Sequence, residues 1–121
     1  MASASNGSRA HARKPAPNPQ EYLLSGFGSC MMVAYLVGTS VMGIQLAQLE
    51  IEVRSEIDLG GFLGVTPAAS VPLQGIRYVV RVAGDGTTEQ FERLRETAQA
   101  HSPNAMSLAN GVAVSGTVQV L

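Results

Sequence analysis

The one side chain in this sequence with strong nucleophilic chemistry is a single cysteine, Cys30, within an apolar stretch. A cysteine thiolate attacks electrophiles such as peroxides, whereas a cysteine packed in an apolar core behaves as a small inert hydrophobic residue. One cysteine excludes an intrachain disulfide and any site with several thiolate ligands. The residues alone leave both interpretations of Cys30 open.

Three other groups of residues lack the pattern that their chemistry would need. His11 and His101 have no metal-ligand spacing with a carboxylate or with Cys30, so we expect surface histidines. The glycine-rich residues 60–64 precede no helix that begins with Lys and Ser or Thr, so they do not form a phosphate-binding loop. The serines near Cys30 lack the strand–turn–helix context of a serine hydrolase. We therefore expect no metal and no cofactor.

The cysteine must be positioned by a helix, which the sequence predicts over residues 18–43. Asn18 is a suitable N-cap and Pro19 fits the first helical position. Glu21 falls in the first turn, where a carboxylate is favoured by the helix dipole, and Gly43 is a natural residue to end the helix. No other segment of the chain predicts so long a helix.

No charged residue occurs from Tyr22 through Leu49, so the predicted helix is apolar all round. Such a helix is either buried in a core or spans a membrane. Gly and Ser dilute its middle, no basic residue anchors its end, and an alternating pattern follows directly. We therefore expect a core helix, no membrane span, and a cytoplasmic protein.

Small residues recur every four positions along this helix, at Gly26, Cys30, Ala34 and Gly38. Positions four apart share one helix face, and a stripe of small side chains allows another backbone to approach closely. Cys30 is therefore expected on a packing face.

After the helix, the pattern predicts two strands, at residues 44–58 and 75–83, joined by a loop over residues 60–72. Acidic residues alternate along the first strand, and Arg77 and Arg81 lie along the second, which favours antiparallel pairing.

A second helix is expected from the capping box of Thr87 and Gln90 to about His101, followed by a break at Pro103. A short turn and a last strand from Gly111, with alternating valines, complete the pattern. The fold class is α+β, with the long helix packed on an antiparallel sheet.

Composition constrains the partners of this chain. Hydrophobic residues make up 45 % and charged residues 14 %, which leaves little charge to cover a monomer, so we expect a second subunit. The net charge of −1 gives no electrostatic footprint for nucleic acid. Residues 1–17 are expected to be a disordered polar tail, with a mitochondrial transit peptide as the alternative, and residues 18–121 a single domain.

Several segments in order resemble the OsmC/Ohr family of thiol-dependent peroxide reductases. NPQEYLLSGFGSC, ending at Cys30, is similar to the family's signature of an Asn-Pro and an acidic residue that open a long helix with a cysteine about three turns on. The strand with its Asp-Leu-Gly-Gly turn, and the helix TTEQFERLRETAQAHSPN, also resemble family segments. The resemblance covers roughly residues 17–121 and implies an intertwined homodimer with two central helices packed back to back.

The resemblance implies reduction of organic hydroperoxides, with Cys30 as the peroxidatic thiol and Glu21 as the helix-entry carboxylate. Gln20 occupies the alternative register for that carboxylate. The family's resolving cysteine corresponds to Ser102, which cannot form a disulfide, and its arginine lies on N-terminal strands that this chain lacks. The resemblance therefore implies an impaired enzyme or a one-Cys enzyme that uses an external thiol. The alternative is a non-catalytic dimer of this fold that binds a small apolar ligand.

Overall fold

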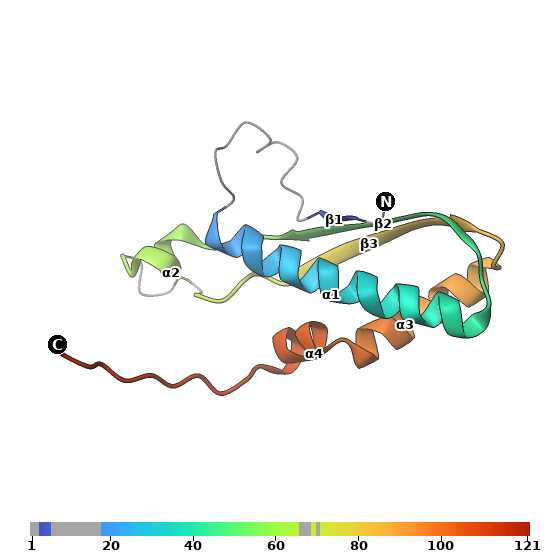
Figure 1. Ribbon diagram of the computed structural model, residues 1–121. Helices are drawn as coiled ribbons and strands as arrows, with labels where there is room; N and C mark the ends of the chain where they lie inside the picture. Colours follow the sequence, from blue (N-terminus) through green and yellow to red (C-terminus); the bar gives the residue numbers. More distant parts are fainter. Residues whose placement is uncertain (1–2, 6–17, 66–68, 70) are drawn as a thin grey trace.

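The computed structural model describes residues 3–5, 18–65, 69 and 71–121. Its elements follow in the order β1 (Ser3–Ser5), α1 (Pro19–Met42), β2 (Leu46–Ser55), α2 (Leu59–Leu63), β3 (Ile76–Gly84), α3 (Thr88–His101) and α4 (Pro103–Asn110). Helix α1 runs between the sheet on one side and α3 and α4 on the other (Figure 1). The long helix is therefore the centre of the molecule.

Helix α1 begins and ends where local sequence signals predict. The Asn18 side chain accepts a hydrogen bond from the Glu21 backbone N–H, and the Glu21 carboxylate accepts one from the Asn18 backbone N–H, at 2.8 Å each. This reciprocal pair satisfies two N–H groups that the helix geometry leaves without partners. Gly43 ends the helix in the left-handed conformation, which glycine adopts at little cost.

The sheet has the order β1-β2-β3, with β2 and β3 antiparallel, as predicted, and the short β1 parallel to β2. On its outer face, the Arg81 guanidinium donates to the carboxylates of Glu50 and Glu52, both at 3.1 Å. This contact is the predicted cross-strand pairing of acids and arginines. The hydrogen bond from Arg81 lowers the pKa of the Glu52 carboxyl.

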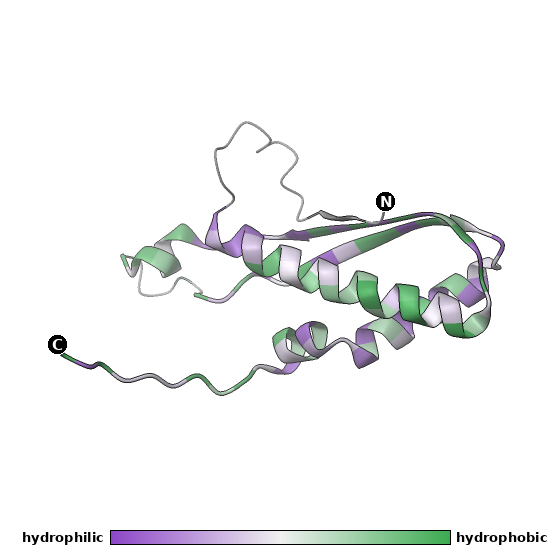
Figure 2. Cartoon of the chain, viewed as in Figure 1, coloured by the Kyte–Doolittle hydropathy of each residue, from purple (hydrophilic) through white to green (hydrophobic). Residues whose placement is uncertain are grey.

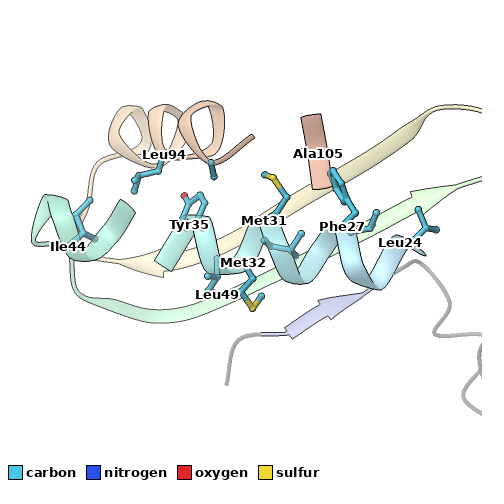
Figure 3. Packing of buried hydrophobic residues seen from close by; sticks show 12 residues of the cluster. Leu24, Phe27, Met31, Met32, Tyr35, Ile44, Leu49, Leu94 and Ala105 are labelled. Atoms are coloured by element: carbon cyan, nitrogen blue, oxygen red, sulfur yellow. The ribbon is translucent and has the colours of Figure 1, made fainter. Parts of the chain in front are cut away.

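The core lies between β2, α1 and α3, and Figure 3 shows its side chains pointing from these elements toward one another. In Figure 2, hydrophobic residues follow one another along the later half of α1, whereas α3 alternates between hydrophilic and hydrophobic residues. Side chains from all layers contribute to the buried cluster: Leu24, Phe27, Met31, Met32, Tyr35, Ile44, Leu49, Ile51, Val53, Leu94, Ala98 and Ala105.

Helix α1 is long and apolar enough to cross a membrane by length and composition alone. In the structure it packs as a core helix, because one side lies on β2 and another contacts α3 and α4. That arrangement agrees with the expected core helix.

Two connections that the sequence predicts as a loop and a turn contain short helices in the structure. The expected loop after Asp58 contains the short helix α2, because the Asp58 side chain accepts from the backbone N–H groups of Gly60 and Gly61 and caps it. The expected turn after Pro103 is the helix α4, since proline at the first position suits a helix start.

The predicted last strand is wrong for this chain as the structure has it. Residues 111–121 form no strand, and their valines are exposed. A strand needs a neighbour for its backbone N–H and C=O groups, and this segment extends away from the three described strands (Figure 1).

The predicted polar tail lies outside the described residues, except that Ser3–Ser5 forms β1 where no element was expected. His11, which the sequence predicts to be a surface histidine, also lies outside the described residues.

Candidate functional site

Cys30 lies near the middle of α1, is half-buried, and has a polar neighbour at its sulfur. The Ser102 hydroxyl donates to the Cys30 Sγ atom over 3.0 Å, although the two residues are 72 positions apart. The resemblance implied that position 102 lies near the thiol, and the structure has the two side chains in contact. The roles of both residues remain predictions.

Ser102 is held at the junction of two helices. It ends α3 and caps α4, where its Oγ atom accepts from the backbone N–H of Ala105 at 3.1 Å. Pro103 follows at the first position of α4 and cannot continue α3. The side chain is 0 % exposed, so the chain turn between α3 and α4 fixes its position beside Cys30.

The small-residue stripe of α1 brings α3 and α4 close enough for this contact. A Cβ atom added at Gly38 would lie 2.5 Å from Leu94 Cδ2, so this glycine makes room for a core side chain of α3. At the other end, the Asn104 side-chain amide donates to the Gly26 carbonyl at 2.9 Å. The stripe is therefore a packing face, as predicted, and its partner is the same chain.

A groove of about 640 Å³ opens between α1 and α3 beside Cys30. Its wall on α1 is apolar and includes Val33, Val37 and Val41. Its wall on α3 includes the cationic Arg93 and the exposed His101. Sequence reasoning missed Arg93, because no motif links it to a cysteine 63 positions away, and treated His101 only as a surface residue.

Glu21 does not reach Cys30 within the chain. The two residues are nine positions apart on α1, which separates them by about 13 Å along the helix axis at about 1.5 Å per residue. Glu21 is buried, and its carboxylate closes the capping box with Asn18. Gln20, in the alternative register, is half-buried. The spacing of Asn18 and Glu21 is that of a capping box, which gives the Glu21 carboxylate a structural role at the start of α1.

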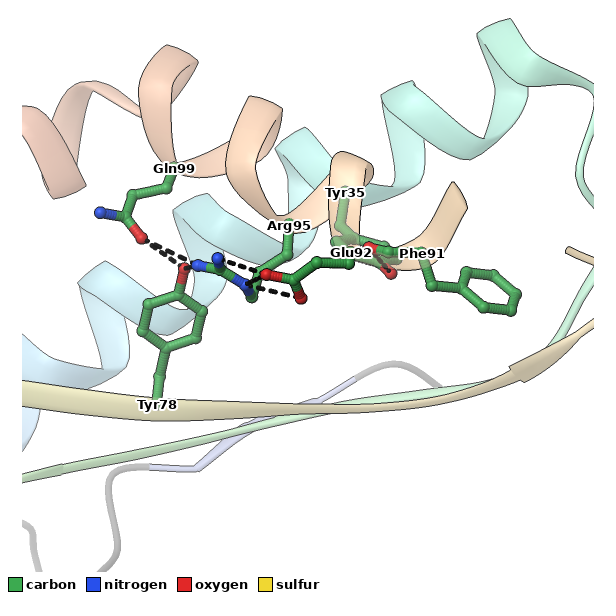
Figure 4. Close-up of polar contacts among 6 residues, drawn as sticks. All are labelled: Tyr35, Tyr78, Phe91, Glu92, Arg95 and Gln99. Carbon is green, nitrogen blue, oxygen red and sulfur yellow. Dashed lines mark hydrogen bonds and ion pairs between the residues drawn. The ribbon is translucent and has the colours of Figure 1, made fainter. Parts of the chain in front are cut away.

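A polar cluster joins β3 to α3 (Figure 4). Arg95 forms an ion pair with Glu92 at 2.6 Å and donates to the Tyr78 hydroxyl at 2.9 Å. The Tyr78 hydroxyl in turn donates to the Gln99 side chain at 2.6 Å. The hydrogen bond from Arg95 lowers the pKa of the Glu92 carboxyl, so both charges persist at neutral pH. These groups satisfy one another and hold α3 against the sheet.

Tyr35 also joins the helices, because its hydroxyl donates to the Phe91 carbonyl at 2.9 Å. Burial, followed by the nearby charge of Glu92, raises the pKa of Tyr35 to about 12. Its phenol is therefore a structural hydrogen-bond donor at neutral pH. Within the described part of the chain, no group of three His, Cys, Asp or Glu side chains could hold a metal ion.

Comparisons with known proteins agree on the fold. A family model described as OsmC-like protein matches residues 10–116. An OsmC-like protein from Mycoplasma pneumoniae, solved as a crystal structure, superposes with a TM-score of 0.70 and 14 % identity, over 86 % of this chain and 70 % of that one.

A second crystal structure, an OsmC-like hydroperoxide resistance protein from Jannaschia sp. CCS1, gives a TM-score of 0.66 and 14 % identity, over 88 % of this chain and 69 % of that one. At this identity the likeness establishes the fold. No curated protein matches the sequence.

Proposed function

This chain belongs to the OsmC-like protein family, and from that premise we propose that it reduces organic hydroperoxides through Cys30. The observation that carries the proposal is the position of this thiol, half-buried beside a hydrogen-bond donor and open to an apolar groove. An organic hydroperoxide combines an apolar body with a polar O–O–H end, so such a groove suits it. One structural relative bears the name hydroperoxide resistance protein.

The proposed reaction is a two-electron oxidation of the sulfur. The Cys30 thiolate attacks the outer oxygen of the hydroperoxide, so that an S–O bond forms and the O–O bond breaks. The alkoxide leaves and takes up one proton to become an alcohol, while the sulfur becomes a sulfenic acid. Arg93 lines the same groove, where its positive charge favours an anionic sulfur and the departing oxygen.

Regeneration is proposed to require an external thiol, because Ser102 stands where a resolving cysteine would act. A thiol attacks the sulfenic acid, releases water and forms a mixed disulfide, and a second thiol then releases the reduced enzyme with a new disulfide. The protein would therefore act as a one-Cys enzyme, in the cytoplasm, where thiols are kept reduced.

We also propose that the protein is a homodimer. Val33, Val37 and Val41 form a stripe on α1 that the chain leaves exposed, and the valines of residues 112–120 are exposed as well. Apolar surface of this extent on a soluble protein is typical of an interface. Light scattering should give twice the chain mass of 12.6 kDa, and a stable monomer at micromolar concentration would contradict the proposal.

A second candidate function is a non-catalytic dimer that binds a small apolar ligand. The groove at Cys30 favours it, as does another cavity of about 440 Å³ lined by Leu23, Phe27 and Leu108. Under this candidate, Cys30 is only part of the lining, and its thiol has no special reactivity.

The two functions differ in the rate of one reaction. Under the enzyme proposal, Cys30 reacts with cumene hydroperoxide at least about a hundredfold faster than a free cysteine, since positioning and charge stabilisation each contribute to catalysis. Consumption of the peroxide in the presence of dithiothreitol measures the rate, and Cys30→Ser is the control that should abolish it. A rate equal to that of free cysteine would leave the ligand-binding candidate.

A further inference from the structure

The buried hydroxyl of Ser102 has two hydrogen-bonding roles, and capping α4 uses only one of them. As a helix cap, the oxygen accepts from the Ala105 backbone N–H at 3.1 Å. Capping requires no donor, yet the hydroxyl proton is directed to the Cys30 Sγ atom, 3.0 Å away. Ser102 is 0 % exposed, so its hydroxyl proton is shielded from solvent and has the sulfur as its acceptor. The Ser102 hydroxyl therefore serves as a hydrogen-bond donor to the sulfur in addition to capping α4.

A hydroxyl donor beside a cysteine sulfur stabilises the thiolate more than it stabilises the neutral thiol. A neutral thiol is a weak acceptor, whereas a thiolate is a charged acceptor, and hydrogen bonds to charged groups are about twice as strong as neutral ones. The N–H of Ala105 polarises the hydroxyl in the same direction, because it donates to the oxygen whose proton points to the sulfur. The first turn of α4 adds partial positive charge on the same side.

The charged side chain in the groove beside Cys30 acts in the same sense. It is Arg93, which lines the groove from α3 together with the uncharged Thr97 and with His101. Among the described residues that line this groove there is no carboxylate. From α4 the lining residue is Pro103, which is uncharged. No described neighbour in the groove therefore opposes a negative charge on the sulfur.

We propose that Ser102 is a positioning residue for Cys30, whose capped and buried hydroxyl favours the anionic sulfur and holds it toward the groove. The inference rests on the proposed function only in that Cys30 is the group that reacts. Serine at position 102 cannot resolve the sulfenic acid as a disulfide. Under this inference it instead assists the earlier step, in which Cys30 attacks the hydroperoxide.

Alkylation by iodoacetamide tests the role without any peroxide. The thiolate displaces iodide and forms an S–C bond, so the rate follows the fraction of anionic sulfur. At pH 7, Ser102→Ala should alkylate about tenfold more slowly than the wild type, as expected for the loss of one hydrogen bond to a charged group. The two rates should converge at about pH 10, where a cysteine is ionised with or without the donor.

Two further variants separate this role from helix capping. Ser102→Gly also removes the hydroxyl but retains most of the capping preference, so it should be as slow as Ser102→Ala. Thr87→Ala removes a matched cap from α3, whose side chain accepts from the Gln90 N–H, and should alkylate at the wild-type rate. Ser102→Thr keeps a hydroxyl and should remain within about threefold of the wild type.

Equal rates at pH 7 for the wild type and for folded Ser102→Gly would overturn the inference, as would an equal loss in Thr87→Ala. Failure of the proposed function gives a different result. In that case Cys30 would react with cumene hydroperoxide no faster than free cysteine does. The difference in alkylation rate between the wild type and Ser102→Gly would persist.

Discussion

Two neighbouring stripes of α1 have opposite surroundings. The stripe of Gly26, Cys30 and Gly38 is covered by α3 and α4, through contacts to Asn104, Ser102 and Leu94. The adjacent stripe of valines at positions 33, 37 and 41 is 63 %, 58 % and 81 % exposed. The chain by itself completes the packing around the thiol and leaves the valine stripe open. The contact between Cys30 and Ser102 therefore forms within one chain, whereas the valine stripe, which also forms one wall of the groove at Cys30, would be covered by the proposed second subunit.

The largest expected effect comes from the covered side of α1. Met31 is 0 % exposed, and Met31→Ala should lower the free energy of unfolding by about 2–5 kcal/mol, because it removes buried methylene groups and leaves a cavity. Met42→Ala is the matched control on the same helix, where the side chain is 39 % exposed and the loss should be much smaller. Urea denaturation measures both. Equal losses would mean that Met31 is packed no more tightly than Met42.

The open side is tested by a charge on the valine stripe. Val37→Asp should raise the dissociation constant of the proposed dimer by about a hundredfold or more, because an unpaired buried charge is very unfavourable in an apolar interface. Val79→Asp, on the outer face of β3 and 51 % exposed, should leave the dimer intact. Sedimentation over a range of concentrations gives the comparison. An undisturbed dimer of Val37→Asp would place the interface elsewhere.

A moderate effect is expected from Tyr35, which links the covered side to α3. Its pKa of about 12 lies above the ordinary value of 10.0, so unfolded chains lose the phenol proton first as the pH rises. The stabilisation is complete below pH 10 and is lost between pH 10 and 12, by up to about 1.4 kcal/mol per pH unit.

Tyr35→Phe should therefore show a weaker loss of stability in alkali than the wild type, and a stability lower by about 1 kcal/mol at neutral pH from the missing hydrogen bond to Phe91. Tyr22→Phe, at a position 62 % exposed, is the control and should retain the wild-type profile. Identical alkaline profiles for all three proteins would contradict the assignment.

The smallest effect is expected on the outer face of the sheet, away from both stripes. Arg81 lowers the pKa of Glu52, so their pairing stabilises the fold above about pH 4.3, the ordinary range of a glutamate, and this contribution is lost as the pH falls below it. Arg81→Ala should reduce the difference in melting temperature between pH 7 and pH 3 only slightly, since exposed pairs contribute little. A large change would show that the pair is not a surface contact.

Local signals predicted the elements around Cys30 well. Asn18, Pro19 and Gly43 determine the ends of α1 through caps, and the Thr87 and Gln90 box determines the start of α3. Each of these signals lies within four residues of the helix end that it specifies. Elements of this kind can be read from one segment of sequence.

The candidate site was only partly predictable because its contacts are distant in sequence. The contact between Cys30 and Ser102 was expected from the family resemblance and not from spacing, and Arg93 was missed altogether. Pro103 was interpreted as a helix breaker, although it both ends α3 and begins α4. The last strand was predicted from alternating valines, but a strand also needs an adjacent strand, which no pattern within residues 111–121 supplies.

The most direct test of the site weighs the intact protein after one equivalent of cumene hydroperoxide. The wild type should gain one oxygen atom, because its single thiol stops at the sulfenic acid. Ser102→Cys should instead lose two hydrogen atoms, since a thiol placed beside Cys30 can bridge it when the two Cβ atoms lie about 3.5–4.5 Å apart. A variant that gains oxygen and never forms the bridge would contradict the assignment of positions 30 and 102 to one thiol site.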